Sequence, residues 1–286
     1  MILVTGGSGQ LATALARAPR VRVVGRPAFD FDRPDTIDTV MATTNPALVV
    51  NAAAWTAVDA AETDPDGAAR ANRDGPACLA ALCARAGIPL IHISTDYVFD
   101  GEKREPYAEE DEARPISVYG ASKLEGERRV LQADSKHVVA RVSWVFGPDR
   151  PSFIDAIIKR ARNEERVDAI ADKWASPSYT IDLARMLRQL IDEPAATGVF
   201  HLTNAGSCSW QEYGQWALDC CLAEGVSLRA THVEPLKMAE MKNFIARRPV
   251  YSTLATAKYQ RVVGNRPRAW QDAVRDYITK HVRDRE

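Results

Sequence analysis

The sequence lacks a continuous apolar segment long enough to cross a membrane, and it lacks a surplus of either charge. Its 286 residues include 37 Lys and Arg against 38 Asp and Glu, which gives a formal net charge of −1. Without a basic surplus the chain has a weak electrostatic basis for binding nucleic acid or an anionic membrane, so we expect neither as a partner. The first residues, MILVTGG, carry no basic region of the kind that begins a signal peptide, and we expect a cytoplasmic protein.

Cysteine is scarce, and neither cysteine nor histidine is spaced as in a metal site. The five cysteines are Cys78, Cys83, Cys208, Cys220 and Cys221. No two of them form a C-x-x-C pair, and the five histidines are equally scattered. Because cysteine is among the residue types most often buried, we expect reduced, buried thiols and assign no residue to a metal.

Short apolar runs rich in valine and isoleucine alternate with longer helical patterns over the first half of the chain. The runs predict strands at residues 2–5, 21–25, 47–51, 88–94, 137–142 and 198–204, and the longer patterns predict helices at 10–18, 34–43, 64–86, 118–133 and 153–162. Continuous apolar strands separated by helices are typical of a parallel sheet that is covered on both faces. We therefore predict an α/β fold with a doubly wound parallel Rossmann-type sheet.

The alternation weakens after about residue 145, where tryptophan, proline and glycine become more frequent. This change predicts a smaller C-terminal substrate-binding domain, packed against the carboxyl ends of the strands. We expect residues 1–145 and 180–204 to form the dinucleotide-binding domain, and residues 146–179 and 205–286 to form the substrate domain.

The first predicted strand is followed directly by the glycine-rich segment TGGSGQLA, residues 5–12. Glycines in such a turn let backbone amides approach a pyrophosphate at the start of the next helix, and the motif permits Ala12 in place of its third glycine. A turn with a purely structural role is the alternative. Because the segment lies between a strand and a helix, we favour dinucleotide binding and place four residues at the cofactor: Gly6, Gly9, Gln10 and Leu11.

An arginine stands at the end of the second predicted strand, where an acidic residue often binds the ribose of NAD. Arg26 follows Gly6 by about 20 residues, a spacing at which its guanidinium could pair with the 2′-phosphate of NADP. A solvated surface arginine is the alternative, because Asp30 and Asp32 follow closely and could still reach a ribose. We assign Arg26, Asp30 and Phe31 to the cofactor site, and we prefer NADPH to NADH.

The segment VYGASKLEGE, residues 118–127, places a tyrosine and a lysine one helical turn apart. Tyr119 and Lys123 would project from one face of the helix, and Thr95 would emerge near them at the carboxyl end of the fourth strand. A nearby ammonium lowers the pKa of a phenol and so brings Tyr119 toward proton transfer. A coincidence on a helix surface is the alternative. Together with the glycine motif, the three residues predict hydride transfer to a carbonyl, with Lys123 also holding the nicotinamide ribose.

Five segments together carry a family resemblance: TGGSGQLA, NAAAWTAVDAAE (51–62), ISTDYVFDG (93–101), YGASKLEGE (119–127) and RVSWVFG (141–147). With them the chain resembles the extended short-chain dehydrogenase/reductases and, more narrowly, the dTDP-4-dehydrorhamnose reductase family. The likeness continues through SPSYTIDLA, GVFHLTNAGSCSW and RPVYSTL, so it covers nearly the whole chain. It implies NADPH-dependent reduction of the C4 ketone of dTDP-4-dehydro-L-rhamnose, with Thr95, Tyr119 and Lys123 in the catalytic positions.

The resemblance also implies contacts outside this catalytic unit. It places Ala52, Ala53 and Ala54 beside the cofactor, and Thr56, Val58, Thr95, Trp144 and Arg248 beside the dTDP-sugar substrate. Core packing is the alternative for Trp144, and solvation is the alternative for Arg248. Some relatives form a homodimer through Mg²⁺ held by glutamates, so a homodimer and a Mg²⁺ requirement stay open for this chain.

Two further features concern the loops around the predicted site. Asn72 could satisfy the backbone of the cofactor loop or lie on a helix surface. The segment DKWASPSYT (172–180) differs from the family's usual Asp-Gln-x-Gly-x-Pro-Thr pattern by carrying Lys173, Ala175 and Ser178, which leaves the exact sugar open.

Two other functions also stay open. One is a reductase or epimerase that acts on another nucleotide sugar on the same scaffold. The other is a non-catalytic regulatory subunit, a role that relatives of this family in animals have for methionine adenosyltransferase. Intact Thr95, Tyr119 and Lys123 argue against the second function.

Overall fold

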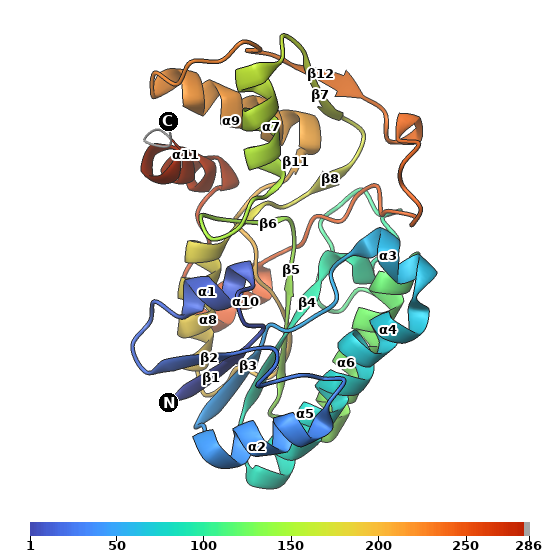
Figure 1. Ribbon diagram of the computed structural model, residues 1–286, viewed down its shortest axis with the longest axis vertical. Coiled ribbons are helices and arrows are strands. Elements are labelled where there is room, and N and C mark those ends of the chain that lie inside the picture. Colours follow the sequence, from blue (N-terminus) through green and yellow to red (C-terminus); the bar gives the residue numbers. More distant parts are fainter. Residues whose placement is uncertain (283–286) are drawn as a thin grey trace.

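A six-stranded parallel sheet forms the lower part of the molecule (Figure 1). The computed structural model describes residues 1–282. The strands are β1 (Ile2–Thr5), β2 (Val21–Val24), β3 (Leu48–Asn51), β4 (Leu90–Thr95), β5 (Val138–Val142) and β10 (Gly198–His201), and they lie in the order β2-β1-β3-β4-β5-β10. All six predicted strands are present, and the predicted α/β fold with a doubly wound Rossmann-type sheet is confirmed.

Helices cover both faces of this sheet. One face is covered by α1 (Gln10–Leu15), α8 (Thr180–Ile191) and α10 (Ala257–Val263), and the other by α2 (Pro34–Thr44), α5 (Gly75–Ala86) and α6 (Val118–Ala133). Val4 and Val50 pack on the first side, whereas Leu3 and Val49 pack on the second, and all four side chains are fully buried. Burial on both sides explains why the strand sequences are continuous apolar runs rather than alternating ones.

A separate hydrophobic cluster forms the upper lobe in Figure 1. Its helices are α7 (Phe153–Asn163), α9 (Trp210–Ala223) and α11 (Trp270–His281), accompanied by the short strands β6 (Val145–Phe146), β7 (Val167–Ile170), β8 (Trp174–Ala175), β9 (Ser178–Tyr179), β11 (Cys208–Ser209) and β12 (Val233–Leu236). The division of the chain into 1–145 with 180–204 and 146–179 with 205–286 stays a prediction. Helix α10 falls in the second part of that division, although its Tyr259 packs with the sheet.

The strand order determines where a ligand can bind. In open parallel sheets the ligand crevice lies outside the carboxyl ends of the strands, at the point where the connections leave in opposite directions. That point lies between β1 and β3, whose last residues Thr5 and Asn51 are register partners. Thr95 ends β4 beside Val142 of β5. The fold thus brings polar side chains from three strands to one edge.

The helix predicted over residues 64–86 is present as a continuous helical run from Pro65 to Ala86, but it is not α-helical throughout. It consists of α4 (Pro65–Ala69), a π-helical turn η1 (Arg70–Asp74) and α5, and the short helix α3 (Val58–Thr63) precedes it. Pro76 favours the π-helical turn, because proline lacks the backbone N–H that would continue the α-helical bonding there. In η1 the Gly75 amide donates to the Arg70 carbonyl, one residue further back than in an α-helix.

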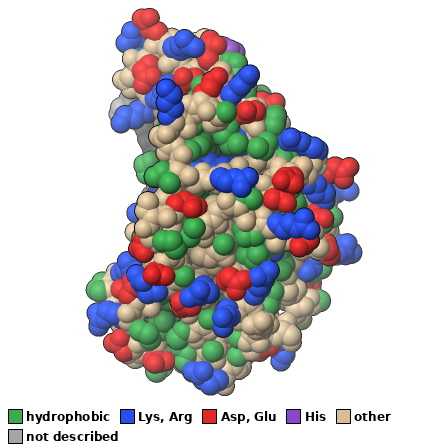
Figure 2. Space-filling view, turned by 90° about the vertical axis from the view of Figure 1, so that its right-hand side faces the viewer, with side chains coloured by type: hydrophobic (Ala, Val, Ile, Leu, Met, Phe, Trp, Pro, Cys, Tyr) green, Lys and Arg blue, Asp and Glu red, His purple; other side chains and the backbone are tan. Residues whose placement is uncertain are grey.

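The surface carries both charges. On the face shown in Figure 2, Lys and Arg side chains are interspersed with Asp and Glu. Within residues 1–282, no helix is both long enough and apolar enough to cross a membrane. The expectation that nucleic acid and membranes are not partners stays a prediction.

We predict that Gly126→Ala destabilises the fold and that Gly214→Ala does not. Both glycines lie inside helices, but a Cβ atom at Gly126 would lie 2.0 Å from the Asn72 carbonyl oxygen, whereas at Gly214 the nearest atom is Cγ2 of Ile157 at 3.4 Å. Gly126→Ala should lower the free energy of unfolding by about 1–3 kcal/mol because the helix must move. Gly214→Ala should leave it unchanged or raise it by up to about 1 kcal/mol, since alanine favours a helix. Denaturant unfolding followed by circular dichroism measures both, and equal effects would contradict the prediction.

Candidate active site

A cavity of about 780 Å³ lies along the carboxyl edge of the sheet, where the loops after β1, β2, β3, β4 and β5 meet. Most of the predicted site residues line it. They are Gly6, Gly9, Gln10, Leu11, Arg26, Asp30, Phe31, Ala52, Ala53, Ala54, Thr56, Thr95, Tyr119, Lys123 and Trp144. Segments that are far apart in the sequence face one space because parallel strands end at a common edge.

Glycine lets the loop after β1 pass close to its neighbours. Gly6 has a φ of +106°, and a Cβ atom there would lie 2.9 Å from the backbone of Ala52. A Cβ atom at Gly25 would lie 2.5 Å from Cα of Gly7, so the ends of β1 and β2 are also in close contact. At these positions the loop presents backbone rather than side chain to the cavity, as the close approach of a pyrophosphate requires. The loop therefore fits a dinucleotide.

The Gln10 side chain connects this loop to a distant one. Its Nε2 donates to the carbonyl oxygens of Gly147, at 3.2 Å, and Arg150, at 2.8 Å. Arg17 adds a second connection, with Nη2 2.6 Å from Oδ1 of Asp149. These contacts hold the loop before α7 at the cavity.

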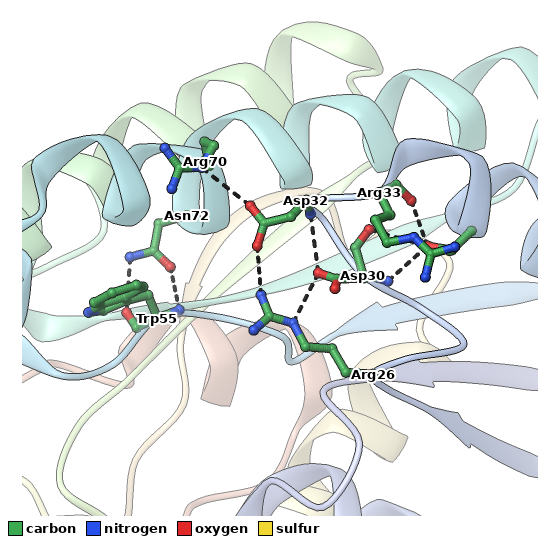
Figure 3. Close-up of polar contacts among 8 residues, drawn as sticks. Arg26, Asp30, Asp32, Arg33, Trp55, Arg70 and Asn72 are labelled. Carbon is green, nitrogen blue, oxygen red and sulfur yellow. Dashed lines mark hydrogen bonds and ion pairs between the residues drawn. The ribbon is translucent and has the colours of Figure 1, made fainter.

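Arg26 lines the cavity, but two carboxylates of the chain already bind its guanidinium (Figure 3). Its Nε lies 3.0 Å from Oδ1 of Asp30, and its Nη2 lies 3.0 Å from Oδ2 of Asp32. Arg70 approaches Asp32 from η1, with Nε at 3.3 Å from Oδ1. The Arg26 side chain is 67% exposed, and ion pairs of such exposure contribute little stability. A phosphate could therefore replace them.

Asn72 holds the loop after β3 in place. Its Oδ1 accepts the Trp55 backbone N–H at 2.9 Å, and its Nδ2 donates to the Trp55 carbonyl at 3.0 Å (Figure 3). The same Nδ2 donates to the Ser122 hydroxyl of α6 at 3.0 Å, and the side chain is fully buried. The prediction that Asn72 satisfies the loop backbone is confirmed, and the alternative of a helix-surface asparagine is wrong.

Thr95 and Tyr119 both line the cavity. Burial raises the pKa of Tyr119 to about 12, while the nearby Thr95 hydroxyl lowers it and the charge of Asp96 raises it. The expectation that Lys123 brings this pKa down is wrong in this structure, because burial outweighs the other influences. A phenol with this pKa stays protonated near neutral pH.

Lys123 is fixed by the strand that carries Thr95. Its Nζ donates to the Ile93 carbonyl at 2.7 Å and lies 3.5 Å from Nε2 of His92. Burial lowers the pKa of Lys123 to about 8, although the negative charge of Glu127 raises it. The amine is therefore mostly protonated at neutral pH.

A buried hydrogen-bond chain orients the His92 ring beside Lys123. Oδ1 of Asn51 accepts from the Thr5 hydroxyl at 2.6 Å and from the Ala53 amide at 3.2 Å, so the Asn51 NH₂ group turns toward Nδ1 of His92, at 2.9 Å. Nδ1 accepts this bond, which leaves the ring proton on Nε2, facing Lys123. Burial, with the charge of Lys123, lowers the pKa of His92 well below its usual value, so the ring is neutral.

A buried ion pair lies one helical turn beyond Lys123. Nη2 of Arg141 on β5 is 2.7 Å from Oε2 of Glu127 on α6. The Ser94 hydroxyl donates to Oε1 of the same carboxylate at 2.5 Å. Charge-assisted bonds of this kind are strong, and they join α6 to the two strands beside it.

Trp144 combines a strained backbone with an unsatisfied indole. Its φ is +38°, a region that large side chains rarely adopt. Its Nε1 is buried without a hydrogen-bond partner among residues 1–282. The ring also packs against Trp210 and Tyr213, with centroids 5.5 and 6.1 Å away. Because strain and unsatisfied donors concentrate at ligand sites, the two features favour a ligand contact, while the ring contacts agree with core packing.

Two predicted substrate residues, Val58 and Arg248, do not line the cavity. Val58 packs in the small hydrophobic cluster around Tyr119. Nη2 of Arg248 lies 2.6 Å from Oδ2 of Asp59, and the guanidinium stacks on the Phe244 ring at 3.6 Å from its centroid. The Arg248 side chain is only 8% exposed, so the alternative of a solvated arginine is wrong. No local pattern could reveal this pair, because its members lie near opposite ends of the chain.

The sequence patterns do not assign some of the residues that line the cavity. These are Ser8, Ser143, Arg150 and Pro151, among others. Ser94 and Trp55 also line the cavity, as expected from their places in the segments ISTDYVFDG and NAAAWTAVDAAE. Arg150 and Pro151 have no such signal, because their loop reaches the cavity only through long-range contacts.

Comparisons with known proteins agree with this geometry. The family model described as the RmlD substrate binding domain matches residues 1–283. A dTDP-4-dehydrorhamnose reductase of Sinorhizobium fredii is 36% identical over 287 residues, which cover 97% of this chain and 96% of that protein. A probable dTDP-4,6-dihydroxy-2-methyloxan-3-one 4-ketoreductase of Streptomyces antibioticus is 36% identical over 96% of this chain and 93% of its own length.

A solved structure is similar over the same extent. The crystal structure of dTDP-4-dehydrorhamnose reductase from Bacillus anthracis, in complex with NADP, matches with a TM-score of 0.89 at 29% identity. The match covers 97% of this chain and 98% of that one. Because the family model and these relatives cover nearly the whole chain, the resemblance is confirmed: the chain belongs to the dTDP-4-dehydrorhamnose reductase family.

Proposed function

We propose that this protein is an NADP-dependent oxidoreductase that reduces the C4 ketone of dTDP-4-dehydro-L-rhamnose to dTDP-L-rhamnose. The observation that carries the proposal is the meeting of Thr95, Tyr119 and Lys123 in the cavity that the glycine loop also lines. Family membership supports the reaction class. The Bacillus anthracis relative in complex with NADP supports the cofactor.

The residues of the cavity fit NADPH. In the proposal the backbone of Gly6 and Gly9 receives the pyrophosphate, and Arg26 exchanges its carboxylate partners for the 2′-phosphate. Lining residues Gln10, Leu11, Asp30, Phe31, Ala52, Ala53 and Ala54 complete the cofactor site. When bound, the nicotinamide supplies the hydride that the ketone carbon accepts.

Tyr119 supplies the proton. Its pKa of about 12 keeps the phenol protonated at neutral pH, which is the form that can donate to the ketone oxygen. Thr95 lines the same cavity and is proposed to hydrogen-bond the ketone oxygen beside that phenol. Lys123 lines the same cavity, where the Ile93 carbonyl holds its ammonium in position, and it is proposed to bind the nicotinamide ribose.

Two residues that line the cavity are assigned to the substrate. Trp144, with its unsatisfied indole N–H, and Thr56 line the cavity and are proposed to contact the dTDP-sugar. Roles for Val58 and Arg248 in substrate binding stay predictions, as do a homodimer, a Mg²⁺ ion and a cytoplasmic location. The Streptomyces antibioticus relative favours a second candidate, reduction of a different dTDP-linked 4-keto sugar.

Consumption of NADPH by the purified protein tests the proposal directly. The protein is supplied with dTDP-4-dehydro-L-rhamnose, oxidation is followed by nicotinamide absorbance, and the product is identified by mass and sugar stereochemistry. Oxidation that yields dTDP-L-rhamnose is the expected result. Tightly retained NAD without net oxidation would indicate an epimerase instead. NADPH binding without turnover would point to a different keto sugar, and co-purification with a synthetase would point to a regulatory subunit.

Tyr119→Phe should abolish most turnover while leaving NADPH binding intact, because only the proton donor is removed. We expect kcat to fall by about 10²- to 10⁴-fold. Tyr259→Phe is the matched control, since its hydroxyl donates to Oε1 of Gln189 at 2.6 Å, outside the cavity, and turnover should persist. Steady-state rates and NADPH fluorescence titration provide the two measurements. Undiminished turnover of Tyr119→Phe would contradict the assigned role.

Arg26→Ala should weaken binding of NADPH more than binding of NADH. Loss of a charge-assisted bond to phosphate should raise the Kd for NADPH by about 10- to 100-fold and leave the Kd for NADH nearly unchanged. Arg33→Ala is the control, because Arg33 is also exposed and pairs with Asp35 at 3.7 Å but does not line the cavity. Calorimetric titration with each nucleotide measures both constants. Equal losses for the two cofactors would dismiss the phosphate contact.

A further inference from the structure

Asp59, in the first turn of α3, binds a segment that lies 186 to 189 residues further along the chain. Its Oδ1 accepts the backbone N–H groups of Ile245 and Ala246, each at 2.9 Å. The same oxygen accepts from Nη1 of Arg248 at 3.0 Å, and Oδ2 accepts from Nη2 at 2.6 Å. One carboxylate therefore takes four hydrogen bonds from this distant segment.

The segment is folded around the Arg248 guanidinium. Nη1 also donates to the Ala246 carbonyl at 2.8 Å, and the guanidinium lies 3.6 Å from the centroid of the Phe244 ring. Phe244 in turn meets Trp210 of α9 edge to face, with centroids 6.3 Å apart. In Figure 1 the chain after β12 descends from the upper lobe toward α3. We call residues 244–248 the strap, because they join the upper lobe to α3.

The helix that the strap binds continues directly from the loop after β3. Residues 52–56 of this loop line the cavity. Ala54, Thr56 and Ala57 are exposed, so the end of the loop has little packing of its own. Ala57, at the N-cap of α3, has no side-chain oxygen that could accept a capping hydrogen bond. Asp59 is therefore the residue through which the start of α3 and the end of the loop are anchored.

We propose that Asp59 and Arg248 are positioning residues for the sugar nucleotide: their ion pair fastens the strap to α3 and thereby fixes Trp55 and Thr56 at the cavity. The inference deepens the proposed ketone reduction and rests on it. In this role Arg248 acts on substrate binding through the loop after β3 and does not contact the substrate itself.

The geometry of the pair suits a fixed contact. Two parallel N–H···O bonds determine both the distance and the orientation of guanidinium and carboxylate. The Arg248 side chain is 8% exposed and that of Asp59 is 34% exposed, so solvent screens the pair less than an exposed one. Hydrogen bonds from Arg248 hold the pKa of Asp59 well below its usual value, so the carboxylate stays ionised in enzyme assays. Removal of either partner leaves the other without its counter-charge and releases the strap.

The other end of α3 is attached to the lower lobe. Oε1 of Glu62 accepts the backbone N–H of Val118, the first residue of α6, at 2.8 Å. Val58 packs in the small hydrophobic cluster around Tyr119. Loss of the strap should therefore loosen the start of α3 and the cavity loop, while Tyr119 keeps its place on α6.

Steady-state kinetics of Asp59→Ala, Arg248→Ala and the double variant test the proposal. Each single change should raise the KM for dTDP-4-dehydro-L-rhamnose by about 3- to 30-fold, with a smaller fall in kcat, because the catalytic residues are carried by β4 and α6. The double variant should resemble the single ones, since all three lose the same contact. Asp59→Asn should have a smaller effect, because its amide oxygen can still accept from the two backbone N–H groups.

A direct contact between Arg248 and the substrate diphosphate predicts a different pattern. Asp59→Ala would then free the guanidinium and leave KM unchanged or lower it, whereas Arg248→Ala alone would raise KM. That pattern overturns the positioning role. Asp168→Ala is the matched control, because Oδ1 of Asp168 pairs with Nη1 of Arg160 at 3.0 Å and neither residue lines the cavity. Its KM should equal that of wild type, and a rise as large as that of Asp59→Ala would refute the proposal.

Hydrogen exchange separates this inference from the proposed function, because it requires no turnover. The backbone amides of Ala53 and Trp55 are hydrogen-bonded and should exchange slowly while the loop is held. In Asp59→Ala, exchange followed by mass spectrometry should become faster at residues 52–57 as well as at 244–248. Faster exchange confined to residues 244–248 would show that the pair anchors the strap alone, and it overturns the proposal.

A second variant keeps the test decisive if Asp59→Ala does not fold. Asp59→Asn should then show the same faster exchange at residues 52–57 to a smaller extent, and unchanged exchange there refutes the proposal. A wild-type protein without ketone reduction would refute the proposed function, while the exchange experiment still tests the strap.

Discussion

The common edge at which the parallel strands end is the constraint on which the whole site depends. Both faces of the sheet are covered by helices, so polar side chains of the strands can reach a ligand only at this edge. Thr5 and Asn51, the last residues of β1 and β3, are fully buried and contact loop backbone and His92 rather than the cavity. The ends of β1 and β3 therefore form a supporting layer, whereas the end of β4 brings Thr95 to the cavity itself.

That supporting layer determines the direction in which Lys123 can act. The Ile93 carbonyl takes one of its donors, and the chain from Thr5 through Asn51 leaves a proton on Nε2 of His92, so the imidazole cannot accept a second. The remaining donors of the ammonium are free to point toward the cavity that Lys123 lines. A hydrogen-bond chain that starts at β1 thus sets the orientation of a side chain on α6.

Local patterns in the sequence were sufficient to predict the strands, the glycine loop and the Tyr119 and Lys123 pair. Each of these features is encoded within a few neighbouring residues, as an apolar run or a helical spacing. The π-helical turn before Pro76 could not be predicted in this way, because a proline inside a helical pattern can also kink or end the helix. The high pKa of Tyr119 could not be predicted for a similar reason. Burial is a property of the fold, and it raises this pKa to about 12, whereas the neighbouring Lys123 in the sequence suggests a lowered value.

The cations near the cavity show most clearly what local sequence patterns do not predict. The sequence indicates Arg26, Arg248 and Lys173 but not how deeply each one is buried, and burial decides what each cation can do. Arg26 is largely exposed, so its weak ion pairs can give way to a phosphate. Arg248 is nearly buried in a two-bond pair with Asp59, and removing one member of such a pair leaves the other charge uncompensated. Lys173 is completely buried, and its Nζ donates to the Pro249 carbonyl at 2.8 Å. Burial thus separates a cation that can exchange its partner for a ligand from cations that the fold holds in place.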